Sequence, residues 1–462
     1  MSGSLLEPID VDPAALLALH AASPELYPAL FESAAAGEPL GRSSASGAGG
    51  SAYLRGSRYD ILFAHPAGRL IASPGSERFL PALDRWWQRE RVQGAQDTAR
   101  TVPFAGGWLV YLGYELAGQI EPRLRLPQPT AGPTAQAIRI PAAVVHEHDS
   151  GRCWIVAEDT AADLVPRIAA DLRRVAPLPE ARAGLIESAV AEDDPRRYLR
   201  AVERALEYIG AGDIYQANLA RGWQATLRSG MQPHQVYRRL RETNPGPFSG
   251  LALLDGIAVI SSSPERLVSV RDGLVTTRPI AGTRPRGADP EADRALAREL
   301  HAHPKERAEH VMLIDLERND LGRVCEPGSV QVDEFMTIES YSHVHQIVSN
   351  VRGRLRTDIT PGNVLAAVFP GGTITGCPKV RCMEIIAELE CAPRGAYTGS
   401  LGYLNRDGGM DMNILIRSLQ LDGRALTLRA GAGIVADSIA ERELEETRAK
   451  ARGVLRALGV EG

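Results

Sequence analysis

Glutamates spaced three residues apart on two predicted helices are the side chains of this sequence best suited to hold a divalent cation. Glu306 and Glu309 share one face near the start of the first helix, and Glu443, Glu446 and Lys450 form one stripe on the second. Mg²⁺ prefers a few carboxylates together with water and substrate oxygens. A solvated helix face would give the same stripe, and spacing alone does not bring the two helices together.

Two glycine-rich segments offer backbone N–H groups to an anion. Residues 369–379 (FPGGTITGCPK) contain a Gly-Gly turn, but Cys377 and Pro378 stand where a phosphate loop needs Gly-Lys-Ser/Thr, so ATP binding is not indicated. Residues 429–433 (RAGAG) follow a predicted strand and would let a ligand lie against bare backbone. A tight turn or a β-bulge is the simpler explanation of either segment taken alone.

A pair of histidines two residues apart, His343 and His345, would share one face of a strand. No cysteine and no HExxH pattern accompanies them, so zinc is not indicated there. His345 as a neutral imidazole could donate a hydrogen bond or move a proton, and a buried core histidine is the structural alternative. The sequence also lacks Gly-x-Ser-x-Gly and a GxGxxG after a strand, which argues against a serine hydrolase and a nicotinamide enzyme.

Charge and composition restrict the partners of these groups. The 462 residues carry 52 basic and 57 acidic side chains, a net charge of −5 without a basic block, which argues against nucleic acid and anionic lipid. An anionic substrate must therefore be held by a local positive cluster or by a metal. Five cysteines without CxxC spacing, an N-terminus without an apolar signal region and no long apolar run predict a cytoplasmic protein that does not enter a membrane.

Hydrophobic periodicity predicts the elements that must position these residues. A helix starts at Asp194 and ends at Gly210, a second covers 304–320, and a third starts at a capping box of Ser438 and Glu441 and runs to about Leu458. Short β-branched or aromatic runs predict strands at 59–63, 107–111, 142–146, 154–157, 251–254, 258–261, 267–270, 274–277, 426–430 and 433–435. This mixture predicts an α+β protein with large antiparallel sheets.

Three stretches are expected to be loops. Residues 43–51 are small and glycine-rich, 122–141 contain five prolines, and 175–184 contain two more. We take the last stretch as the boundary between a β-rich N-terminal region, 1–180, and a catalytic region, 190–462. Because large sheets often draw strands from both halves of a chain, we expect the two regions to interleave into one fold.

Six motifs in a fixed order give the sequence a family resemblance. They lie at 212–219, 263–266, 278–284, 308–320, 371–381 and 446–450. Together they resemble the chorismate-utilising enzymes, which include the large subunit of anthranilate synthase, aminodeoxychorismate synthase component I, and isochorismate and salicylate synthases. The resemblance covers about 194–458, and a weaker one extends to 30–34 and 106–114. It implies an α+β fold of two large antiparallel sheets packed as a sandwich with flanking helices.

The resemblance also implies roles for individual residues. Glu309 and Glu446 would bind Mg²⁺, with Glu306 and Glu443 as outer or alternate ligands. Glu265 would be the general acid that protonates the departing C4 hydroxyl of chorismate. The remaining implied contacts with chorismate are Lys450, Arg417, Tyr397 and the amides of Gly431 and Gly433 for the carboxylates, and His345 and Thr375 for the ring substituents.

Position 281 separates the branches of this family. Aminodeoxychorismate synthases often have a lysine here that can attack C2, whereas this chain has Ala281, as anthranilate synthases usually do. The alanine argues against isochorismate and salicylate synthesis. Thr375, where anthranilate enzymes tend to have serine, and the stretches 215–218 and 247–249 favour aminodeoxychorismate synthase. Anthranilate synthase is the alternative, and a non-catalytic chorismate-binding paralogue is a remote one.

Two further partners follow from the resemblance alone. The chain contains no recognisable glutaminase, so ammonia would come from a separate glutamine amidotransferase subunit. Family members have a tryptophan pocket near a motif that corresponds to Glu32 and Ser33 here, so a bound tryptophan is possible.

Overall fold

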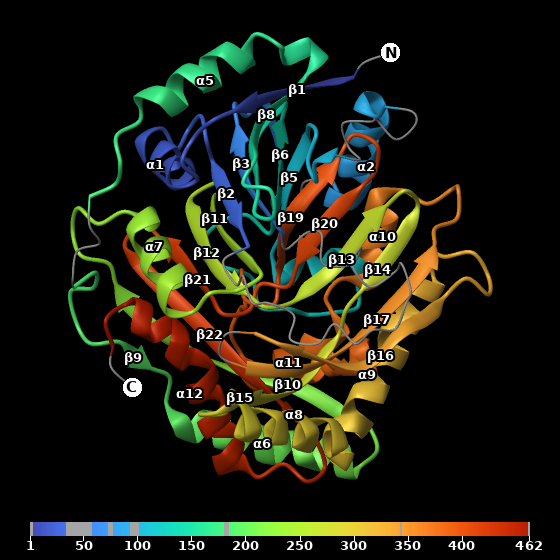
Figure 1. The fold of residues 1–462 in the computed structure, drawn as a ribbon. Helices are drawn as coiled ribbons and strands as arrows, with labels where there is room; N and C mark the ends of the chain where they lie inside the picture. Colours follow the sequence, from blue (N-terminus) through green and yellow to red (C-terminus); the bar gives the residue numbers. More distant parts are fainter. Residues whose placement is uncertain are drawn as a thin grey trace.

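The structure is a computed structural model that describes residues 3–33, 58–72, 77–92, 101–179, 184–341 and 344–460. Two large antiparallel sheets pack face to face, and helices cover their outer faces (Figure 1). The predicted α+β sandwich is therefore confirmed. No helix in the described ranges is long and apolar enough to cross a membrane.

The first sheet has 12 strands. Its path is β1 (Ser4–Ile9), β8 (Cys153–Glu158), β7 (Ala142–Glu147), β3 (Tyr59–Ala64), β2 (Ala29–Glu32), β11 (Phe248–Leu253), β12 (Ile257–Ser263), β21 (Ser418–Asp422), β22 (Ala425–Ile434), β10 (Gln216–Thr226) and β18 (Gly376–Cys377), with β9 (Ala191–Glu192) beside β10.

The second sheet has 10 strands. Its path is β15 (Ile280–Pro285), β17 (Val344–Arg354), β14 (Leu274–Thr277), β13 (Arg266–Arg271), β20 (Met410–Asn413), β19 (Ser400–Asn405), β5 (Gly107–Leu112), β6 (Ala135–Ile140) and β4 (Gly68–Ala72), with β16 (Gln331–Ser340) beside β17. Because β2 pairs with β11 and β5 pairs with β19, strands from before residue 180 and after residue 190 interleave in both sheets.

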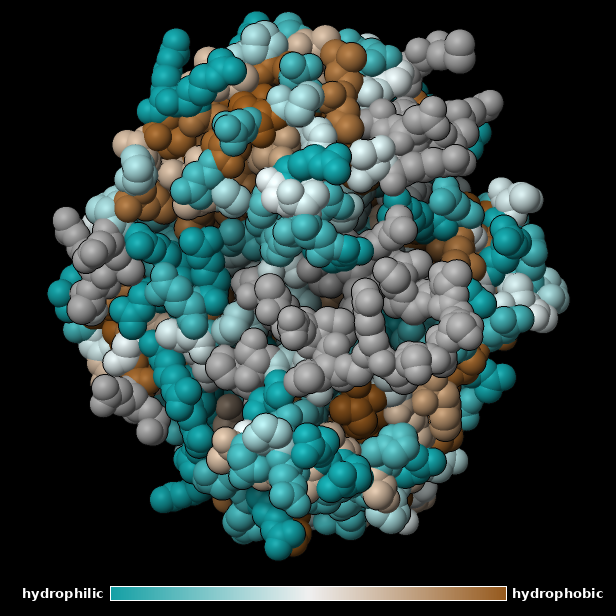
Figure 2. Space-filling model, in the orientation of Figure 1, coloured by the Kyte–Doolittle hydropathy of each residue, from teal (hydrophilic) through white to brown (hydrophobic). Residues whose placement is uncertain are grey.

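Helices flank this sandwich. They are α1 (Ala14–Ala22), α2 (Phe79–Glu90), α4 (Ala117–Ile120), α5 (Leu164–Arg174), α6 (Pro195–Gly210), α7 (Pro233–Thr243), α8 (Pro290–Ala302), α9 (Pro304–Gly322), α10 (Pro361–Val368), α11 (Lys379–Glu390) and α12 (Ala440–Ala457). The face shown in Figure 2 is largely hydrophilic over α6, α8 and α12, and more apolar around α1 and α5.

Three apolar clusters form the core. One lies between the two sheets and contains Phe63, Leu109 and Val259; another joins the first sheet to α1, α5, α7 and α12. The third packs α2, α9 and α10 against the second sheet. The strands that carry the site are thus buried on both faces, which fixes their register and the direction of every side chain on them.

The predicted helices form, but one expected cap does not. Helix α6 begins at Pro195 after Asp194, whose carboxylate accepts a hydrogen bond from the Arg196 amide (3.0 Å). Helix α12 begins instead after Ile439 without a side-chain cap. The expected capping box is wrong because the Ser438 hydroxyl accepts a hydrogen bond from the Val435 amide (3.1 Å).

Two strand predictions are also corrected. Residues 122–141 are not loop throughout, since β6 runs from Ala135 to Ile140 between β5 and β4; the prolines flank this strand and leave its amides free. The predicted strands 426–430 and 433–435 are one strand, β22, which pairs with β10 without interruption. The expected loop 43–51 and most of 180–184 lie outside the described residues.

Candidate active site

The carboxylates of α9 and α12 come together although they lie about 130 residues apart in the sequence. Lys305 joins the two helices, with its Nζ 4.0 Å from Glu309 and 3.0 Å from Asp437, just before α12. Burial raises the pKa of Glu309 to about 7, and the negative charges of Glu306, Asp437 and Glu446 add to this effect. Glu309 thus lies near the acidic residues around the start of α12, whereas Glu446 is exposed and paired with Lys450, so a metal-ligand role for these glutamates stays a prediction.

The oxygen donors of this cluster suit Mg²⁺. Burial also raises the pKa of Glu443, so the buried Glu443 and the half-buried Glu309 face an excess of negative charge that a cation would relieve. Among the described residues the glutamates do not form a set of three whose oxygens lie within 4.8 Å of one another. This openness fits a cation that binds one or two carboxylates and completes its shell with water and substrate oxygens.

Glu306 is placed differently from Glu309. Its carboxylate lies 3.3 Å from Arg284 on β15, so it already has a cationic partner. Gly282 beside it has a φ of 66°, in the left-handed region that favours glycine. Glu306 is therefore less available to a metal than Glu309, and a ligand role for it stays a prediction.

Two cationic side chains near this cluster, Lys450 and Arg417, could bind an anion. Lys450 on α12 contacts Glu446 (2.7 Å) and donates a hydrogen bond to the Gly431 carbonyl (3.0 Å). Burial lowers the pKa of Arg417, and among the described residues no carboxylate lies within ion-pair distance of its guanidinium. Arg417 also has a φ of 54°, a strained value for a residue other than glycine. A half-buried guanidinium without a counter-ion is a strong indication of an anionic ligand.

The glycines of β22 make room beside these cations. A Cβ at Gly431 would lie 2.7 Å from Asn218 Oδ1 and 2.8 Å from the Tyr397 hydroxyl, and one at Gly433 would lie 2.6 Å from Gln216 Nε2. Asn218 Oδ1 and Gln216 Oε1 are buried without a protein partner. Both lie in the first sequence motif, which was used to compare branches but not to predict contacts.

Glu265 occupies the short connection between β12 and β13 and is 5% exposed. Burial raises the pKa of its carboxyl to about 7, against the opposing influence of Thr373, Lys450 and the Ile280 amide. The residue thus combines a buried, readily protonated carboxyl with a position near the cation that anchors the pocket. Thr373, whose hydroxyl is buried without another partner, was not among the predicted site residues.

Ala281 lies next to this carboxyl, on β15. Its neighbour Ile280 presents an amide to Glu265, and Ala281 itself, 9% exposed, pairs with Ile347 on β17. The side chain at position 281 is a methyl group, so this part of the site has no nucleophile of its own.

His345 and Thr375 are held by protein groups. His345 Nδ1 lies 2.7 Å from the Ser340 hydroxyl and Nε2 2.9 Å from the Asp293 carboxylate on α8. The Thr375 hydroxyl donates to the Gly371 carbonyl (2.8 Å), and its own carbonyl accepts from the Asn218 amide (2.9 Å). Thr375 therefore lies beside the glycine strand, whereas a contact of either side chain with substrate stays a prediction.

Glu32 and Ser33 belong to a separate place, at the end of β2. Glu32 accepts a hydrogen bond from Arg241 on α7 (2.8 Å), and the Ser33 amide donates to Asp60 (3.2 Å). Within the described ranges, one carboxylate oxygen of Glu32 and the Ser33 hydroxyl are buried without a hydrogen-bond partner. A bound tryptophan at this motif stays a prediction.

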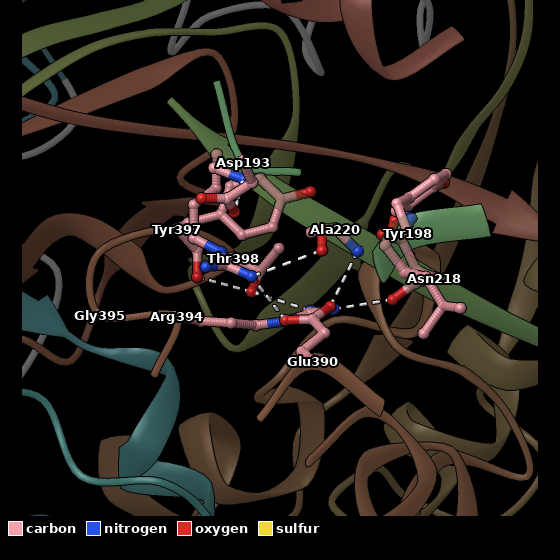
Figure 3. A network of polar contacts seen from close by, with 12 residues as sticks. Asp193, Tyr198, Asn218, Ala220, Glu390, Arg394, Gly395, Tyr397 and Thr398 are labelled. Atoms are coloured by element: carbon pink, nitrogen blue, oxygen red, sulfur yellow. Dashed lines mark hydrogen bonds and ion pairs between the residues drawn. The ribbon is translucent and has the colours of Figure 1, made fainter. Parts of the chain in front are cut away.

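A buried network of ion pairs and hydrogen bonds lies beside Tyr397 (Figure 3). Glu390 lies between Arg394 (2.6 Å) and Arg429 (2.9 Å), and Arg394 also donates to the Asn218 carbonyl (2.7 Å). These side chains line a cavity of about 380 Å³ that reaches Tyr397. Burial raises the pKa of Tyr397 to about 12, so its hydroxyl remains a hydrogen-bond donor at neutral pH.

Comparison with known proteins agrees with this geometry. A family model described as chorismate binding enzyme matches residues 49–456. The chain is 44% identical to anthranilate synthase component 1 of Thermus thermophilus over 77% of this chain and 78% of that protein, and 41% identical to aminodeoxychorismate synthase component 1 of Bacillus subtilis over 77% of each. Anthranilate synthase component I of Streptococcus pneumoniae has a similar fold, with a TM-score of 0.77 and 33% identity over 86% of this chain and 92% of that one.

Proposed function

Because the chain belongs to the family of chorismate-binding enzymes, we propose that it aminates chorismate in a Mg²⁺-dependent reaction that gives 4-amino-4-deoxychorismate. The observation that carries this proposal is the pairing of a buried, protonatable Glu265 with a half-buried cationic pocket. The first suits a poor leaving group that needs a proton, and the second suits a dicarboxylate.

The substrate would be held at its carboxylates. Arg417 supplies a planar guanidinium that has no counter-ion in the part of the chain that the structure describes, and Lys450 supplies a point charge beside the bare backbone of Gly431. Tyr397 and the amide of Gly433 complete the proposed anion site. These donors orient the ring before any bond changes, which converts binding energy into correct positioning.

Mg²⁺ would be held by Glu309 and Glu446, with Glu443 beside them. When bound, it would polarise the ring carboxylate and offset the negative charge of the site. The chain's own contribution is to bury Glu443, to shield Glu309 in part and to hold Glu446 beside Lys450, so that the substrate carboxylate would meet both a metal ion and a lysine.

Glu265 would act as the general acid. A carboxyl with a pKa of about 7 retains its proton in much of the population at neutral pH and can still release it, which is the condition for efficient proton transfer. It would protonate the C4 hydroxyl as that group leaves as water. Burial between β12 and β13 keeps solvent from competing for the same proton.

The nitrogen would come from ammonia supplied by a separate glutamine amidotransferase subunit. Both relatives named above are called component 1, which is consistent with a second component for each. Thr375 and the stretch 215–218 support the 4-amino product. Ala281 favours anthranilate as the second candidate, because without a lysine ammonia itself must attack the ring, and attack at C2 is the first step toward anthranilate.

A product assay distinguishes the two candidates. The chain is incubated with chorismate, Mg²⁺ and ammonium salt at alkaline pH, with and without the lyase that converts 4-amino-4-deoxychorismate to 4-aminobenzoate. We expect 4-aminobenzoate only when the lyase is present. Fluorescent anthranilate formed without the lyase would overturn the 4-amino assignment in favour of the second candidate.

A further inference from the structure

Three side chains at one end of the first sheet form a set of metal donors that shares no residue with the candidate active site. Among the described residues, Asp60, His146 and His148 are the one group of three whose potential ligand atoms all lie within 4.8 Å of one another. Asp60 on β3 pairs in register with His146 on β7, and His148 follows two residues later. The pleat therefore directs Asp60 and His146 to one side of the sheet, and His148, in the turn after β7, reaches the same carboxylate.

Both imidazoles aim at the same carboxylate. His146 Nδ1 lies 3.0 Å from Asp60 Oδ2, and His148 Nε2 lies 2.8 Å from Oδ1. The two rings lie 5.2 Å apart between centroids. Each histidine thus presents a nitrogen to one of the two oxygens of the same carboxylate, and the three potential ligand atoms lie within 4.8 Å of one another.

We propose that Asp60, His146 and His148 bind a divalent transition metal ion of the Zn²⁺ class, with water as the remaining ligand. Two imidazoles and one carboxylate are a donor set that Zn²⁺ accepts, and they contrast with the all-oxygen set of the glutamates, which suits Mg²⁺. The inference does not depend on the reaction proposed above.

The geometry needs only a small adjustment to admit the ion. Bonds of about 2.0–2.1 Å in a tetrahedral shell place neighbouring ligand atoms about 3.4 Å apart, roughly half an ångström more than the two nitrogen–oxygen distances of 3.0 and 2.8 Å. His148 can supply this movement, because it follows the last residue of β7 and its side chain is 26% exposed. Asp60 and His146 are 9% and 12% exposed, so they form a fixed base that His148 closes from the solvent side.

A backbone amide orients the Asp60 carboxylate. The Ser33 amide donates a hydrogen bond to Asp60 Oδ1 (3.2 Å), as a partner to a ligating carboxylate should. Cys153 on β8 pairs in register with His146 and brings a buried thiol beside the group. Metal binding would therefore link β3, β7 and the end of β2.

Metal binding is tested by calorimetric titration of chelator-treated, tag-free protein with Zn²⁺, in a buffer whose Mg²⁺ occupies the glutamate site. We expect one equivalent of Zn²⁺ to bind to the wild type. Loss of an outer partner of a metal ligand already costs about 10- to 100-fold in affinity, so His148→Ala should weaken binding at least tenfold. His301→Ala, which removes an exposed histidine of α8, is the matched control and should bind as the wild type does.

A spectroscopic measurement on the wild type tests the site without relying on the folding of a variant. Co²⁺ bound to the wild type should give the visible absorption of a tetrahedral site, and equimolar Zn²⁺ should remove it. Absence of Zn²⁺ binding, or equal affinity in the wild type and in His148→Ala, would overturn the proposal and leave a carboxylate that only accepts hydrogen bonds from two imidazoles.

Discussion

Replacing Glu265 with glutamine separates the catalytic use of this carboxyl from its effect on stability. The pKa of Glu265 is about 7 in the folded protein and 4.5 in the reference state, a difference of about 2.5. At 1.36 kcal/mol for each pKa unit, ionising this buried group lowers the free energy of unfolding by about 3 kcal/mol. Glutamine keeps the shape and has no proton to lose.

The sign follows from the raised pKa. Below pH 4.5 the carboxyl is protonated in both states, so the wild type has its full stability from this group. As pH rises from 4.5 through about 7, the unfolded chain ionises readily and the folded protein does so at a cost, so wild-type stability falls. The difference in free energy of unfolding between Glu265→Gln and the wild type should therefore grow in favour of the variant over this pH range. At higher pH it should level off at about 3 kcal/mol.

Activity should change in the opposite direction. Without an acid for the C4 hydroxyl, kcat should drop by about 10²- to 10⁴-fold while KM for chorismate changes little, because Arg417 and Lys450 remain. Urea unfolding at a series of pH values and initial rates with ammonium as the nitrogen source measure the two effects. Glu207→Gln, which removes an exposed carboxylate of α6, is the control. A pH-independent stability difference, or near wild-type kcat in Glu265→Gln, would refute the reasoning.

Three other changes test neighbouring parts of the site. Glu446→Gln should abolish the Mg²⁺-dependent initial rate, whereas Glu445→Gln, at an exposed position on α12, should not. Wild-type activity in Glu446→Gln would show that this carboxylate belongs only to a solvated helix face. Ala281→Lys should form a covalent chorismate adduct detectable by intact-mass spectrometry, and its absence would mean that position 281 does not face C2. Arg394→Met should lower the free energy of unfolding by about 3 kcal/mol in urea titrations, because it leaves the buried Glu390 with one cationic partner instead of two, and a neutral effect would contradict this.

Local pattern was sufficient for helices α6, α9 and α12 and for strands such as β3 and β12, because apolar spacing and a proline or glycine at the ends indicate where such an element starts and stops. Other described helices, among them α1 and α7, were not predicted. Local pattern failed where a strand was defined by its neighbours. Residues 135–140 form β6 between β5 and β4 although prolines surround them, and β22 continues through Gly431 and Gly433 because β10 pairs along its whole length. Such pairings join distant segments and leave no local signal.

The site shows the same division. The spacing of Glu306, Glu309, Glu443 and Glu446 was visible in the sequence, but their convergence depends on the Lys305 contacts with Glu309 and Asp437. The different placements of Glu306 and Glu309 depend on Arg284, which no spacing rule connects to them.

The position of the incorporated nitrogen tests the central claim most directly. Chorismate is converted with ¹⁵N-ammonium and Mg²⁺ without the lyase, and the product is examined by NMR. We predict ¹⁵N on C4 of a product that keeps its enolpyruvyl group. Nitrogen on C2 with release of pyruvate, or no incorporation, would contradict the account.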